Sequence, residues 1–113
     1  MHIDVSKNRG TSDDVTVVSV TGNMMGDADL SNKINELLDD GEQKFVVNLS
    51  GVHWINSSGL GVILAAQTRV SQESGQFNLC GLGEKVQFAL KIAHLDEVYD
   101  IYESEEDAIA ALS

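Results

Sequence analysis

The sequence predicts an α/β fold: a single domain over residues 1–113, in which a mixed, mostly parallel β-sheet is covered by about four helices. Two observations lead to this prediction. Short runs of β-branched and apolar residues alternate with longer segments of helical periodicity from residue 15 onward. A stretch rich in turn-forming residues, 8–14, separates the first two strand-like runs and indicates a hairpin.

The predicted strands are short and carry β-branched or alternating apolar residues. We expect them at residues 3–7, 15–20, 45–49, 77–80 and 98–102. The first two should be antiparallel, because a short loop joins them. The strand–helix–strand order that follows favours a right-handed parallel crossover.

Four segments have the apolar spacing of amphipathic helices, at residues 27–40, 58–73, 84–93 and from 104 onward. Each repeats apolar residues on one face, which should point into the core. In chain order these inward residues are Leu30, Ile34, Leu37 and Leu38; Leu60, Ile63, Leu64, Ala66 and Val70; Val86, Ala89, Leu90 and Ala93; and Ala108, Ile109 and Leu112.

Residues that commonly end or cap helices flank these segments. Gly41 and Gly75 follow the first two helices and are expected to stop them. Ser104 and Asp107 resemble a capping box at the start of the last helix. Before the second helix, a connector carries apolar residues that should cover the core: Val52, Trp54 and Ile55.

Composition narrows the function classes. Eighteen acidic and seven basic residues give a formal charge of −11, which argues against binding to nucleic acid or to anionic membranes. A protein partner with a basic surface fits this charge better. The chain shows no signal-peptide pattern and no apolar run of membrane-spanning length, so we expect a cytoplasmic location.

Cysteine and histidine positions favour neither a metal site nor a cofactor. Cys80 is the single cysteine, which excludes an internal disulfide and a multi-cysteine zinc site, and its apolar surroundings predict a buried thiol. His2, His53 and His94 lack metal-ligand spacing. For His53, an exposed loop position is the expectation.

The segment Asn56-Ser57-Ser58-Gly59-Leu60-Gly61 lies where a predicted strand passes to a predicted helix. The first amide groups of a helix lack intrahelical partners, so a serine here could cap the helix. A serine could equally present a hydroxyl, or a phosphate carried on it, at the positive end of the helix dipole. Both interpretations are open for neighbouring serines.

This segment does not match an enzyme motif. The G-x-S-x-G elbow of serine hydrolases fails at both Ser57 and Ser58, and the glycines lack the spacing and the lysine of nucleotide loops. We therefore expect no catalytic residue. A hydroxyl framed by small residues suits a substrate of a protein kinase, since a phosphate adds about −1.5 to −2 charge and can abolish a complex without unfolding the helix.

The runs VNLSGV at residues 47–52 and INSSGLGVIL at residues 55–64 resemble the signature of STAS domains, the anti-sigma factor antagonists. The order of predicted elements agrees with that family over nearly the whole chain. The resemblance implies a sheet with helices on one side. It also implies that Ser57 is phosphorylated by an anti-sigma factor that is itself an ATP-dependent serine kinase, and that Ser58 is left to cap the helix.

In that family the unphosphorylated antagonist binds the kinase and frees a sigma factor, and a metal-dependent serine phosphatase resets the phosphorylated form. By this resemblance the surface that binds the partner comprises Met24, Met25, Asp27, Asn56, Ser57, Ser58 and Gly59. No cofactor is implied.

Two residues depart from the family pattern. Asn56 stands where the family has an aspartate, and Met25 replaces a carboxylate. These departures favour, as one alternative, a STAS module that scaffolds an assembly without being phosphorylated. A second alternative is an accessory subunit of a lipid-transport complex, and a hydrolase is the remaining rival.

Overall fold

The computed structural model describes residues 2–7, 15–26, 29–95 and 100–112. The five strands are β1 His2–Lys7, β2 Val15–Thr21, β3 Lys44–Gly51, β4 Gln76–Cys80 and β5 Asp100–Tyr102. The four helices are α1 Asp29–Asp39, α2 Ser57–Gln72, α3 Glu84–Ile92 and α4 Glu105–Ala110. The predicted hairpin loop at 8–14 and the predicted strand start at 98–99 lie outside the described residues.

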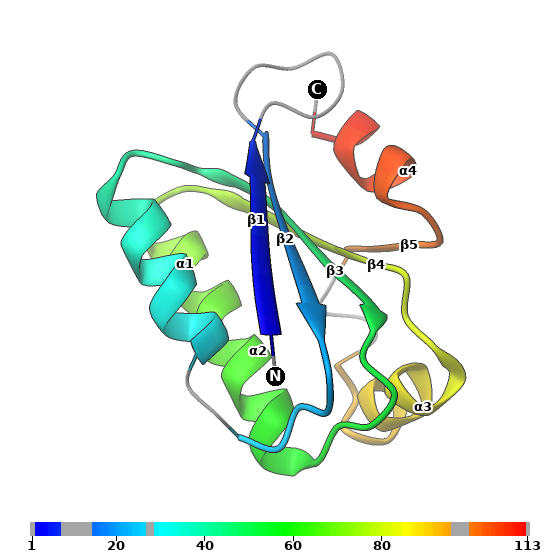
Figure 1. Ribbon diagram of the computed structural model, residues 1–113. Coiled ribbons are helices and arrows are strands. Elements are labelled where there is room, and N and C mark those ends of the chain that lie inside the picture. The colour runs from blue at the N-terminus through cyan, green and yellow to red at the C-terminus, as the bar shows by residue number, and fades with distance from the viewer. Residues whose placement is uncertain (1, 8–14, 27–28, 96–99, 113) are drawn as a thin grey trace.

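The strands form one sheet in the order β1-β2-β3-β4-β5 (Figure 1). β1 is antiparallel to β2, whereas β2, β3, β4 and β5 pair in parallel. This arrangement confirms the predicted α/β fold with a mixed, mostly parallel sheet. Because β2, β3 and β4 are parallel, their carboxyl ends and the loops that follow them open at one edge.

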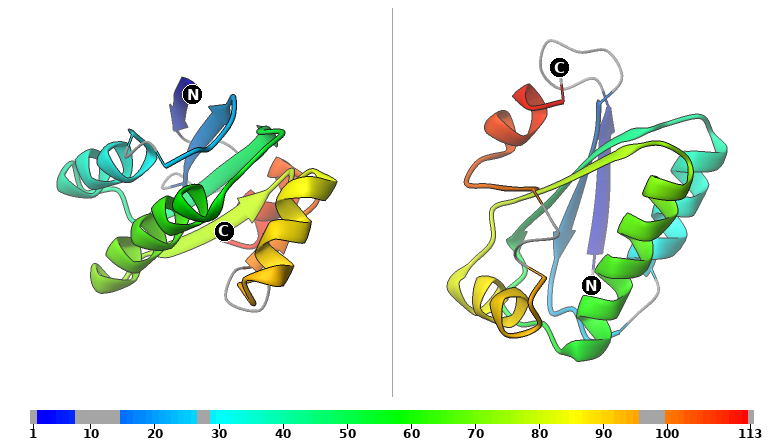
Figure 2. Two further views of the ribbon diagram at one scale, coloured as in Figure 1. Left: turned by 90° about the horizontal axis from the view of Figure 1, so that it is seen from below. Right: turned by 180° about the vertical axis from the view of Figure 1, so that it is seen from behind.

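Helices cover both faces of the sheet, so the expectation of helices on one side is wrong. Figure 2 shows α1 and α2 side by side on one face and α4 on the other. The cause is the sequence of the central strands, which is apolar at successive positions: Val18 and Val47 face α1 and α2, while Val17 and Val46 pack with α4. Strands that are apolar on both faces must be covered on both.

α4 is short, and amide side chains from the sheet help to hold it. Asn78 is buried, and its Nδ2 donates to the carbonyl oxygen of Ala108 at 3.1 Å. Nδ2 of Asn48 donates to Oε1 of Glu105 at 3.1 Å. The predicted inward face of this helix is confirmed: Ala108, Ile109 and Leu112 are buried.

Cys80 lies in the small core beneath α4 and is fully buried, as the sequence predicts. Burial raises the pKa of its thiol from 9.0 to about 11, with a further contribution from the negative charge of Glu105. The thiol is therefore protonated at neutral pH.

Two predicted inward residues of the other helices are exposed. Leu64 lies at the border of the α2 stripe, whose buried members Ile63, Ala66 and Val70 span a narrower arc than predicted. Ala93 comes after the last residue of α3 and is exposed at its C-cap.

The two glycine stops differ. Gly41 follows α1 with φ 97°, as expected of a helix-ending glycine. After α2 the left-handed residue is Ser74, with φ 59°, and Gly75 is not in that conformation. Gly75 is instead required by packing, because a Cβ there would lie 2.5 Å from the carbonyl oxygen of Gln43.

Candidate functional site

The site is built on two loops that leave the carboxyl ends of β2 and β3 and run side by side. Met24 and Ile55 form an isolated parallel bridge between them. The amide of Met24 donates to the carbonyl of Trp54 at 2.9 Å, and the amide of Asn56 donates to the carbonyl of Met24 at 3.2 Å. These bonds fix the first loop against the start of α2.

Asn56 is the N-cap of α2. Its Oδ1 accepts a hydrogen bond from the amide of Gly59 at 2.8 Å, and its backbone is extended. The prediction that Ser58 caps the helix is therefore wrong. The helix begins at Ser57, so the residue before it, Asn56, holds the cap position. An asparagine side chain caps a helix as well as a serine does.

The same side chain also ties the two loops together. Nδ2 of Asn56 donates to the carbonyl oxygen of Met25 at 3.4 Å. An aspartate at this position could still accept from the amide of Gly59 but could not donate to Met25. Asn56 therefore adds a tether between the loops that the family's aspartate could not make.

Two glycines allow the first loop to lie directly on the first turn of α2. A Cβ on Gly59 would stand 2.3 Å from the carbonyl oxygen of Met24. A Cβ on Gly26, which has φ 110°, would stand 2.7 Å from Cβ of Ser58. Gly59 is buried, so its part in the site is this close backbone approach.

The hydroxyls of Ser57 and Ser58 are left at the surface. Both residues are exposed, and no described residue forms a hydrogen bond with either side-chain oxygen. The first turn of α2 carries no acidic residue. Ser57 thus presents a hydroxyl at the positive end of a 16-residue helix, where an added phosphate would be favoured by the dipole.

The two methionines predicted at the contact surface have opposite environments. The side chain of Met25 is 51% exposed beside the cap, whereas that of Met24 is 1% exposed and belongs to the core. The prediction that Met24 contacts a partner is corrected accordingly, because its side chain fills the space between the sheet and the helices. Asp27 lies outside the described residues.

An apolar groove of about 710 Å³ lies between the start of α2 and α3, and Ser57 is on its rim. Trp54 is 47% exposed in this groove, so the expectation that it covers the core is wrong. Nζ of Lys85 lies 5.8 Å from the centre of the Trp54 ring, a cation–π distance. Phe88 and Ile92 form the opposite wall at 64% and 62% exposure.

Sequence reasoning did not find Phe88 and Ile92. They are four residues apart on α3 and lie off its buried stripe of Val86 and Leu90. The sequence could have indicated them, because two large apolar residues on the otherwise polar side of a helix suggest a contact surface.

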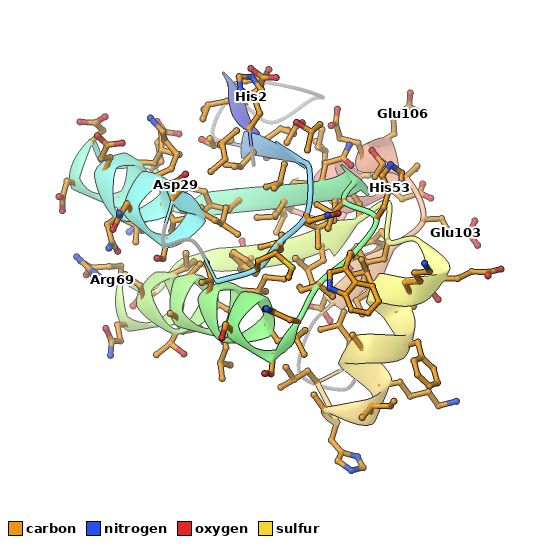
Figure 3. All side chains as sticks on the ribbon, turned by 60° about the horizontal axis from the view of Figure 1, so that its bottom comes forward. His2, Asp29, His53, Arg69, Glu103 and Glu106 are labelled. Carbon is orange, nitrogen blue, oxygen red and sulfur yellow. The ribbon has the colours of Figure 1, made fainter. Side chains whose placement is uncertain are left out.

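No histidine among the described residues lines the groove beside Ser57. His53 is exposed on the connector, and Figure 3 shows it on the outside of the molecule, well apart from His2. Within the described ranges, no three His, Cys, Asp or Glu side chains gather as metal ligands would. None of the helices in these ranges is both long enough and apolar enough to cross a membrane.

The five-stranded, mostly parallel sheet and its four helices define an α/β domain whose exposed serines lie where a loop passes into α2. The STAS domain family model matches residues 6–108, and the chain therefore belongs to the STAS domain family.

Several relatives of this chain are named anti-sigma factor antagonists. The chain is 26% identical to the anti-sigma F factor antagonist of Paenibacillus polymyxa, over 99% of this chain and 95% of that one. The crystal structure of an anti-sigma factor antagonist from Mycobacterium paratuberculosis superposes with a TM-score of 0.75 at 26% identity, covering 96% and 93% of the two chains. The phosphorylated form of the Bacillus cell fate determinant SpoIIAA shares the fold, with a TM-score of 0.72 at 16% identity, covering 99% and 100%.

Proposed function

We propose that this chain is an anti-sigma factor antagonist that binds an anti-sigma factor serine kinase through the surface around the start of α2, and that phosphorylation of Ser57 releases it. One observation carries the proposal: Asn56 makes the cap, so the hydroxyl of Ser57 is exposed and engaged by no described residue. The binding surface comprises Asn56, Ser57, Ser58 and the exposed side chain of Met25. Asp27 is assigned to it by its place in the sequence.

The local chemistry supports a switch of this kind. A phosphate on Ser57 adds about −1.5 to −2 charge at the rim of the apolar groove. A partner fitted to apolar surface there would have to desolvate that charge, which opposes binding. The helix itself tolerates the phosphate, because its N-terminus favours anions and the cap is on another residue.

In the proposed cycle the unphosphorylated protein sequesters the kinase and a sigma factor is released. The kinase transfers the γ-phosphoryl group of ATP to Oγ of Ser57, so that the bond to the β-phosphate oxygen breaks, ADP leaves and the hydroxyl proton is released. A metal-dependent serine phosphatase then hydrolyses the phosphoserine and restores the binding form. The net charge of −11 suits a kinase with a basic docking surface.

The test is incubation of the purified chain with a candidate kinase and ATP, followed by location of the phosphate by mass spectrometry. We expect phosphate on Ser57, none in Ser57→Ala, and unchanged incorporation in the matched control Ser58→Ala. Phosphate found elsewhere, or kinase binding that Ser57→Asp leaves intact, would contradict the proposal.

A second candidate is a STAS scaffold that is not phosphorylated. It is favoured by Asn56, which places an amide where the family has a carboxylate next to the modified serine. Stable kinase binding with no phosphoryl transfer, together with transfer gained in Asn56→Asp, would select this candidate over the first.

A further inference from the structure

The outward face of α3 carries bulky apolar side chains where a surface helix ordinarily carries polar ones. Phe88 and Ile92 are the two most exposed large hydrophobic residues among those described. On the opposite side of the helix, Val86 and Leu90 are fully buried. The outward apolar pair is therefore surplus to the core and marks a contact surface.

Charged residues flank this pair in a definite pattern. At about 100° per residue, Glu84 and Lys91 fall about 40° to 60° to one side of Phe88, and Lys85 and Ile92 fall about as far to the other. All four are exposed. Neither Glu84 nor Lys91 forms an ion pair within the described ranges. We call Glu84, Lys85, Phe88, Lys91 and Ile92 the α3 face.

We propose that the α3 face binds a second copy of this chain, with the two α3 helices antiparallel about a twofold axis at Phe88. Such an axis reverses the helix direction but keeps each flank on its own side. Glu84 then lies beside Lys91 of the partner subunit, and the reverse pair forms as well. On the other flank, Ile92 lies along the aliphatic stem of the partner subunit's Lys85.

Charge complementarity is what selects a second copy as the occupant. The flank that holds Glu84 at one end holds Lys91 at the other, so the face matches its own antiparallel image in sign. The two Phe88 rings meet at the centre, where an aromatic pair is favourable. An unrelated helix would need the same spacing of opposite charges about an apolar residue.

The proposed dimer contact is small, so we expect its affinity to be low. A nine-residue helix pair buries less than the roughly 1,200 Å² at which stable interfaces begin, so the dimer should be weak and dependent on concentration. Ser57 lines the same groove as Phe88 and Ile92, so the dimer and the proposed kinase complex would compete for this surface.

The first test is sedimentation equilibrium of the full chain across the micromolar to millimolar range. We expect a monomer–dimer equilibrium that Phe88→Asp weakens by about tenfold or more, since it removes the central apolar contact and opposes two carboxylates. Met25→Asp is the matched control, because it places the same charge on another exposed apolar residue. A chain that stays monomeric throughout, or a dimer indifferent to Phe88→Asp, would overturn the proposal.

Charge reversal tests the antiparallel pairing itself. Glu84→Lys and Lys91→Glu should each weaken the dimer several-fold, and the double variant should restore it, because the pairs are re-formed with their signs exchanged. Circular dichroism would establish that each variant is folded. If the double variant is weaker than both single ones, the proposed pairing is wrong.

Discussion

Two helices in this chain begin beside serines, and they use them differently. At α4, Oγ of Ser104 accepts a hydrogen bond from the amide of Asp107 at 3.1 Å, so this hydroxyl serves as the helix cap. At α2, Asn56 caps the helix, and the hydroxyls of Ser57 and Ser58 remain at the surface. A structural serine and a modifiable one are thus distinguished by which residue takes the cap position.

The electrostatic surroundings differ in the same sense. The first turn of α4 already carries Glu105, Glu106 and Asp107, whereas the first turn of α2 carries no acidic side chain. A phosphate at α4 would meet like charges in its own first turn, while one at α2 would meet the helix dipole and no acidic side chain in that turn. The start of α2 is therefore better suited than the start of α4 to reversible phosphorylation.

The largest effect is expected where the first loop contacts α2. Gly59→Ala places a Cβ 2.3 Å from the carbonyl oxygen of Met24 and should lower the free energy of unfolding by about 2 to 3 kcal/mol. Gly61→Ala is the matched control in the same helix, because nothing lies within 4 Å of its Cβ. It should raise stability by up to about 1 kcal/mol. Urea denaturation measures both, and equal effects would contradict the close approach.

The caps provide the next comparison. Asn56→Ala should cost about 1 to 2 kcal/mol, because it removes both the cap and the bond to Met25. Ser104→Ala should cost about 1 kcal/mol, and Ser58→Ala less than about 0.5 kcal/mol. Thermal or urea unfolding gives these values. If Ser58→Ala lowers the free energy of unfolding as much as Asn56→Ala does, Ser58 and not Asn56 caps the helix.

A smaller effect concerns pH and the core beneath α4. Because burial raises the pKa of Cys80 from 9.0 to about 11, the thiol ionises in the unfolded chain before it ionises in the folded one. The unfolded state then binds fewer protons, so stability falls as pH rises through this interval. Cys80→Ala should remove that part of the slope in urea titrations at pH 8 and pH 10. An unchanged slope would mean that the thiol ionises normally in the folded protein.

Much of the fold followed from residue patterns, because periodicity reports which side of an element is buried. The pattern at Leu30, Ile34 and Leu37 identified α1, alternation identified β1, and a run of β-branched residues identified β2. The sequence did not predict that α4 covers the face of the sheet opposite α1 and α2. That face is apolar because Val17 and Val46 point toward it, and this depends on how the strands are arranged.

The structural setting of the candidate site followed from the sequence, but its details did not. The segment at residues 56–61 was identified correctly as a strand-to-helix junction, yet the helix starts at Ser57 and its cap is Asn56, two residues before the predicted Ser58. The exposed wall of Phe88 and Ile92 depends on how α3 packs, and a single sequence does not specify that orientation.

The central claim is that a phosphate on Ser57 abolishes partner binding without disturbing the fold, since the cap belongs to Asn56. The most direct measurement is the affinity of the kinase for the chain carrying phosphoserine at position 57, by isothermal titration calorimetry, beside its urea unfolding midpoint. We predict affinity reduced by about a hundredfold or more, which corresponds to about 2.7 kcal/mol, with the midpoint essentially unchanged. Affinity equal to that of the unmodified chain, or a phosphorylated chain that unfolds much more readily, would contradict the account.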